Sequence, residues 1–103
     1  MITFKRSATI AQGVSGSAAL ELAVKIATYL RDEYGTNHQV HLNVGGQQNQ
    51  IHWTFNTESL AEFEALSTKV VADPDYQALL AEAADPPMFR NDTVVDTLYR
   101  SVP

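Results

Sequence analysis

Residues 37–56 read NHQVHLNVGGQQNQIHWTFN, and this stretch decides the fold. Polar and apolar residues alternate on both sides of a glycine pair, Gly45 and Gly46. Successive side chains of a strand point to opposite faces, so the pattern predicts a β-hairpin with one apolar face and one polar face. The expected apolar face consists of Val40, Leu42, Val44, Ile51, Trp53 and Phe55, and the polar face carries His41, Asn43, His52 and Thr54.

The register of this hairpin is constrained by parity. The two apolar sets share a face only if paired residue numbers add up to an odd number. We expect the register that pairs Leu42 with Trp53, Asn43 with His52, and His41 with Thr54. A slip by one residue would oppose apolar to polar side chains at every step. The alternation therefore specifies which side chains share a face, whereas it leaves open slips by two residues.

The flanking sequence supplies two more strands and two helical regions. Residues 1–10 alternate as a strand, and residues 17–34 repeat apolar positions at helical spacing, with Ser17 as the expected cap and Gly35 as the expected stop. Residues 58–84 predict a helix interrupted at Pro74, with Ser59 at its start, and residues 93–102 predict a last strand.

The resulting order is β-α-β-β-α-β, which predicts one α+β domain over residues 1–103. The simplest packing is the ferredoxin-like fold, a four-stranded antiparallel sheet with the helices on one face and the first and third strands in the centre. The other face then shows Met1, Thr3, Lys5, Ser7, His41, Asn43, His52 and Thr54, with Val95 and Tyr99 from the last strand. This mixed face is suited to packing against a second copy, so we expect a homodimer.

Composition excludes several classes of function. The chain has 12 acidic and 7 basic residues and a net charge of -5, which disfavours nucleic acid as a partner. It has no cysteine, which excludes disulfides, thiolate metal sites and a cysteine nucleophile. The lack of cysteine fits a cytoplasmic location, and the sequence contains neither a secretory signal nor a membrane-spanning apolar run.

The layout resembles the dimeric α/β-barrel superfamily, which includes antibiotic-biosynthesis-monooxygenase-like and NIPSNAP-like domains. The resemblance covers nearly the whole chain and rests on element order, the interrupted second helix, and the phrase ADPDYQALL at residues 72–80. It implies a barrel formed by two sheets at a dimer interface, and a ligand pocket between sheet and helices. Members include cofactor-independent oxygenases, haem-degrading enzymes and isomerases. The haem-degrading set of Asn, Trp and His is not carried over, because His52 and Trp53 are adjacent and face opposite ways.

The histidines of the hairpin have two interpretations. His41 and His52 share the polar face, where they serve either as hydrogen-bonded residues of the dimer seam or as a general base. His38 and His41 point to opposite faces and cannot form a local metal pair. No carboxylate joins the histidines on the polar face, and we expect neither a metal nor a cofactor.

The helix-facing side offers candidate binding residues. Trp53 and Tyr76 are each either core aromatics or walls of a pocket for a flat ligand. Arg6 interrupts the apolar face of a central strand, and Asp96 is expected to reach it from the last strand. Such a pair is either structural or orients a polar group of a substrate. The histidines and Arg6 lie on opposite faces of the sheet, so they cannot serve one pocket.

We therefore expect a homodimeric protein that binds a small, partly apolar organic molecule. In one form it is an enzyme of the cofactor-independent monooxygenase or isomerase type, in which His41 or His52 removes a proton and Arg6 stabilises the anion. In the alternative form it is a non-catalytic ligand-binding or dimerisation module.

Overall fold

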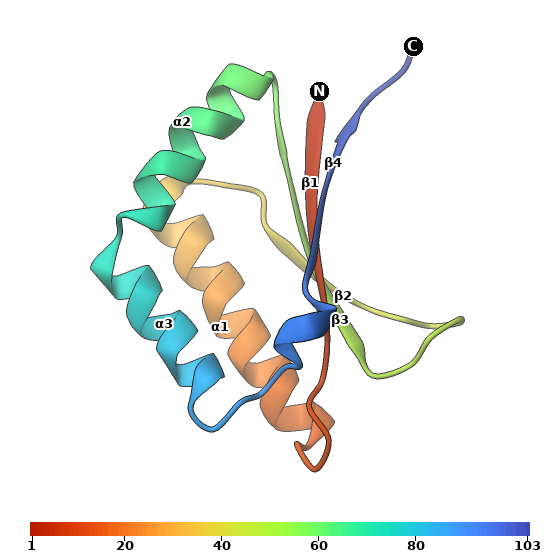
Figure 1. Cartoon of the computed structure of the whole chain (residues 1–103). Helices are drawn as coiled ribbons and strands as arrows, with labels where there is room; N and C mark the ends of the chain where they lie inside the picture. Colours follow the sequence, from red (N-terminus) through yellow and green to blue (C-terminus); the bar gives the residue numbers. More distant parts are fainter.

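A computed structural model describes all residues, 1–103, as one sheet covered on one side by helices (Figure 1). The elements in order are β1 (Ile2–Thr9), α1 (Gly16–Tyr34), β2 (Gln39–Leu42), β3 (Gln50–Thr57), α2 (Leu60–Val71), α3 (Pro74–Ala84), the short 3-10 helix η1 (Asn91–Thr93) and β4 (Val95–Arg100). The strands lie in the order β2-β3-β1-β4, and all neighbours are antiparallel. The predicted ferredoxin-like α+β fold, with the first and third strands in the centre, is confirmed.

The hairpin keeps the predicted parity but not the predicted register. His41 lies opposite His52 and Leu42 opposite Ile51, a shift of two residues from our expectation. The loop is longer than predicted, with Gly46 and Asn49 both at positive φ, 76° and 64°. The carbonyl of Asn49 accepts a hydrogen bond from the Ile10 backbone at 2.8 Å, so the loop is tied to the end of β1 before β3 begins.

The N-cap of helix α1 lies two residues before the predicted cap. The Ser15 hydroxyl accepts a hydrogen bond from the Ala18 backbone at 3.1 Å, so Ser15 is the N-cap and Ser17 lies in the first turn. The helix ends at Gly35, whose φ of 66° is the left-handed conformation predicted for a stop. Its buried side is rich in alanine, which lets the backbone of α1 lie close to the sheet. The buried residues of α1 are Ala19, Leu22, Ala23, Ile26, Ala27 and Leu30.

The break between α2 and α3 is fixed to α1 by one carboxylate. Asp73 caps α3 ahead of Pro74, and its Oδ2 accepts hydrogen bonds from the hydroxyls of Tyr29 and Tyr34 at 2.5 and 2.6 Å. The hydrogen bonds from Tyr29 and then Tyr34 lower the pKa of Asp73 to about 2. This contact sets the position of the first turn of α3, which carries Tyr76.

The core has two parts, and α2 contributes to the second through the partly buried Val70. One part lies between α1 and the sheet around Ile51 and Trp53, and the other joins α1 to α3 around Ile26 and Leu79. Helix α2 has no buried residue. Its half-buried Phe63 packs against Phe4 and Phe55 of the sheet, with 5.5 and 5.9 Å between ring centroids. None of the helices has the length and apolarity needed to cross a bilayer.

Candidate functional site

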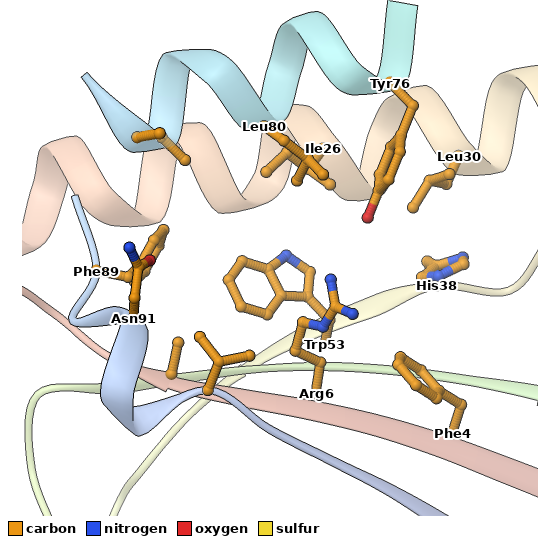
Figure 2. Close-up of a pocket in the computed structure, with 14 residues that line it drawn as sticks. Phe4, Arg6, Ile26, Leu30, His38, Trp53, Tyr76, Leu80, Phe89 and Asn91 are labelled. Atoms are coloured by element: carbon orange, nitrogen blue, oxygen red, sulfur yellow. The ribbon is translucent and has the colours of Figure 1, made fainter. Parts of the chain in front are cut away.

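A cavity of about 260 Å³ lies between the sheet and helices α1 and α3. Most of the side chains around it are apolar (Figure 2). Its lining consists of Phe4, Arg6, Ala8, Ile26, Leu30, His38, Trp53, Tyr76, Leu80, Ala83, Ala84, Phe89, Asn91 and Val94. An apolar cavity with a few convergent polar groups is the usual form of a small-molecule site.

Trp53 forms a wall of this cavity and is also part of the core. Its indole N–H donates a hydrogen bond to the Ala23 carbonyl at 3.1 Å. Its ring packs edge-on against Phe89, with 5.4 Å between centroids and planes at 71°. These contacts hold the indole in one orientation beside the open space. Trp53 is therefore a core residue that also lines the cavity, and its role as a wall for a flat ligand stays a prediction.

Arg6 and Asp96 form the predicted ion pair. They lie directly opposite each other on β1 and β4. Arg6 donates from Nε to Oδ1 at 2.7 Å and from Nη2 to Oδ2 at 2.8 Å, a bidentate geometry. The hydrogen bond to Asp96 raises the pKa of Arg6 further, while burial opposes this shift. With side chains 35% and 45% exposed, the pair contributes little stability and mainly orients the guanidinium.

His38 is a cavity residue that the sequence-based candidates omitted. It is only 6% exposed, and its ring stacks on Phe55 at 4.2 Å between centroids. Its Nδ1 is hydrogen-bonded to the Thr36 hydroxyl. Burial lowers the pKa of His38 to about 4, and the charge of Arg31 acts in the same direction. The imidazole is therefore neutral at pH 7.

Tyr76 reaches the cavity from α3, as predicted for a pocket wall. Its ring descends from the helix layer, and its hydroxyl lies between Arg6 and His38 (Figure 2). Asn91, from η1, lies at the other end of the cavity near Phe89. Neither Phe89 nor Asn91 is predictable as a cavity residue, because both follow α3 in a segment without strand or helix periodicity.

The two hairpin histidines lie on the open face, away from the cavity. His52 Nδ1 is 2.6 Å from the Ser7 hydroxyl, and Nε2 is 2.6 Å from Asn43 Oδ1. His41 Nε2 is 2.8 Å from the Thr54 hydroxyl. The pKa of His52 is lowered by burial and by nearby positive charge.

Both histidines are therefore hydrogen-bonded within the chain, and their place in a dimer seam stays a prediction. A catalytic role for His41 and His52 stays a prediction. No cluster of three or more His, Cys, Asp or Glu side chains is placed to hold a metal.

Comparison with known proteins gives relatives by structure only. No protein-family model matches the chain, and neither does any curated protein. An uncharacterised NIPSNAP domain protein from Burkholderia xenovorans superposes with a TM-score of 0.79 at 14% identity, covering 99% of this chain and 95% of that one. The predicted resemblance is confirmed. The likeness establishes that the two chains share a fold.

Two further solved structures with this fold come from proteins named as oxygenases. A putative antibiotic biosynthesis monooxygenase from Deinococcus radiodurans matches with a TM-score of 0.68 and 17% identity. The match covers 100% of this chain and 94% of the monooxygenase chain. SnoaB, a cofactor-independent oxygenase from Streptomyces nogalater, matches with a TM-score of 0.68 and 14% identity over 97% of this chain and 91% of its own. At such identities the comparison establishes the fold and leaves the activity to be argued from the site.

Proposed function

We propose that the protein binds a small, mostly apolar organic molecule in the cavity beside Trp53 and removes a proton from it without a cofactor. The observation that carries this proposal is that Arg6, Tyr76 and His38 line the same end of a mostly apolar cavity. Apolar walls supply affinity, and the few polar groups fix orientation.

The proposed chemistry uses His38 as the proton acceptor in place of His41 or His52. His38 is neutral at pH 7 because burial lowers its pKa to about 4, so its ring can accept a proton. The imidazolium that forms is stabilised by the negative charge that develops on the ligand beside it. Arg6 lies near His38 in the cavity wall and stabilises negative charge that develops on a carbonyl oxygen of the ligand. Proton abstraction next to a carbonyl is a first step shared by isomerisation and cofactor-independent oxygenation. This arrangement removes the conflict in the sequence-based hypothesis, whose base and Arg6 lay on opposite faces.

A thermal-shift screen of small aromatic ketones and phenols tests the binding. A ligand present at about a hundred times its Kd is expected to stabilise the protein by about 2.7 kcal/mol. The variant Arg6→Gln is expected to bind about 10–100-fold more weakly, because it loses a charged hydrogen-bond donor. Lys5→Gln, which alters the neighbouring residue on the opposite face of β1, is the matched control and should bind normally.

A measurement of catalysis distinguishes the proposed enzyme from the alternative, a non-catalytic ligand-binding module. For a ligand that binds, exchange of the proton next to its carbonyl in D₂O is expected with the wild type and is expected to fall at least about 100-fold in His38→Phe. Binding without exchange in the wild type would favour the non-catalytic alternative. If no compound of the screen stabilised the protein, the proposal would be wrong in both forms.

We also propose that the protein is a homodimer joined through the open face of the sheet. That face carries Val95 and Tyr99, which are 57% and 48% exposed, beside the His41 and His52 hydrogen bonds. Exposed apolar side chains among satisfied polar ones fit a two-fold contact with a second copy.

Val95→Asp is expected to weaken this dimer at least about tenfold, because each copy would bury an unpaired carboxylate at the seam. Light scattering over a concentration series measures the change. Val24→Asp, on the exposed side of α1, is the matched control and should leave the dimer intact. A wild-type monomer at micromolar concentration would contradict the proposal.

A further inference from the structure

A second cavity, of about 630 Å³, adjoins the first on the side of α2 and β4. It lies between α2 and the sheet, beside the contact of Phe63 with Phe4 and Phe55, and its volume is larger than that of the cavity beside Trp53. The two cavities share one set of lining residues, which is Phe4, Arg6, Leu30, His38, Tyr76 and Leu80. They are therefore two compartments of one space, which meet at these shared residues.

The walls of the second compartment are apolar on both sides. Helix α2 contributes Phe63, Leu66 and Val70, although none of its residues is buried in the core. Strand β4 contributes Leu98, which is half exposed on the helix-facing side of the sheet. Apolar side chains thus face each other across an unfilled space, which favours a hydrocarbon occupant.

The junction between the compartments is polar and has unused hydrogen-bonding capacity. Asp96 occupies Nε and Nη2 of Arg6, while Nη1 makes no hydrogen bond within the protein. The Tyr76 hydroxyl oxygen interacts with Arg6 and raises the pKa of the guanidinium, so the hydrogen of this hydroxyl remains to be donated. His38 is held only through Nδ1, which leaves Nε2 for a ligand.

The charge at the junction is balanced. Asp96 offsets the charge of Arg6, and the imidazole of His38 is neutral. The available groups are mainly donors on a charge-neutral frame. They therefore suit a ligand oxygen that accepts hydrogen bonds better than they suit a second cation or a fully charged anion.

We infer that the ligand spans both compartments and has three parts. A flat ring system lies beside Trp53, a carbonyl oxygen binds at the junction to Arg6 and Tyr76, and a hydrocarbon arm runs into the compartment under α2. The inference rests on the proposed function and adds the ligand class, which is a ketone with an aromatic ring on one side and an alkyl chain on the other. The affinity for ligands of different alkyl chain length is therefore set in the second compartment.

Three probes that differ in one part each test this ligand class by calorimetry. They are methyl naphthyl ketone, pentyl naphthyl ketone and hexylnaphthalene, which lacks the carbonyl. The pentyl ketone is expected to bind at least about tenfold more tightly than the methyl ketone, because its additional methylenes become buried. It is expected to bind at least about tenfold more tightly than hexylnaphthalene, which leaves the donors of the junction unpaired.

Variants show which part of the site produces each difference in affinity between the probes. Leu66→Asn and Leu98→Asn, on opposite walls of the second compartment, are each expected to remove the preference for the pentyl ketone and leave methyl ketone binding unchanged. Two separate positions keep the test valid if one variant folds poorly. Arg6→Gln should reduce binding of both ketones and leave hexylnaphthalene unaffected.

The outcomes distinguish this inference from the proposed function. Equal affinity for the two ketones would overturn the inference and leave the proposed cavity in place. A preference for the pentyl ketone that survives in both leucine variants would also overturn it, because the arm would then lie elsewhere. If none of the three probes bound, both the inference and the proposed binding of aromatic ketones would be wrong.

Discussion

Replacing Trp53 with alanine is expected to lower the free energy of unfolding by about 3–5 kcal/mol. The indole is buried in the core around Ile51, packs on Phe89 and donates to the Ala23 carbonyl. The variant loses these contacts and enlarges an existing cavity. A domain of this size is stabilised by about 5–15 kcal/mol in total, so this loss is a large part of the whole.

Denaturant unfolding followed by circular dichroism measures this change, since the variant has no tryptophan to report by fluorescence. Val44→Ala is the control, because Val44 is fully exposed in the hairpin loop and its truncation should stay within about 0.5 kcal/mol. Trp53→Phe keeps an aromatic wall and is expected to fall between the two. A loss below about 1 kcal/mol in Trp53→Ala would show that the indole does not hold the sheet to α1.

His38 is expected to make the fold sensitive to mild acid. Its pKa is lowered from 6.5 to about 4 in the folded protein, so the unfolded chain binds the proton more tightly. The stabilising effect of a neutral His38 is complete above pH 6.5 and is lost as the pH falls through the window down to about 4. After a discount for partial screening, the loss is on the order of 2–3 kcal/mol.

The comparison of the wild type with His38→Phe isolates this effect. Phenylalanine retains stacking on Phe55 and does not titrate, so the variant should lose about 2–3 kcal/mol less stability between pH 7 and pH 4. His52 titrates in both proteins and cancels in the difference. The pKa of Asp73 is lowered from 3.8 to about 2, so the stability that Asp73 contributes is lost only at lower pH. Equal losses in the two proteins, or an NMR titration of His38 near 6.5, would contradict the assignment.

Strand parity made much of the fold predictable. The alternation around Trp53 identifies the buried face of the hairpin. The alternation of residues 1–10 places Arg6 on the same side of the sheet. Pairing of the first and last strands then brought Asp96 to Arg6, as observed. The register was not predictable, because the loop is anchored through Asn49 to Ile10, a contact between residues far apart in sequence.

The site was only partly visible in the sequence. Tyr76 and Trp53 were named as pocket walls, and both line the cavity. His38 was missed although the signal was present, since it has the same parity as Val40 and Leu42 and therefore faces the helices. His41 and His52 lie within the strands of the hairpin, whereas His38 lies just before β2. The second compartment could not be foreseen, because it depends on how far α2 stands from the sheet.

The central claim is that ligand binds in the cavity beside Trp53, and the emission of this single tryptophan tests it most directly. A ligand chosen by thermal shift, and free of absorbance at the emission wavelengths, is titrated into the wild type and Arg6→Gln. We expect a saturable change in Trp53 fluorescence with the wild type, and the same change at about 10–100-fold higher concentration with the variant. A ligand that raises the unfolding temperature while leaving Trp53 emission unchanged would bind elsewhere and would contradict the account.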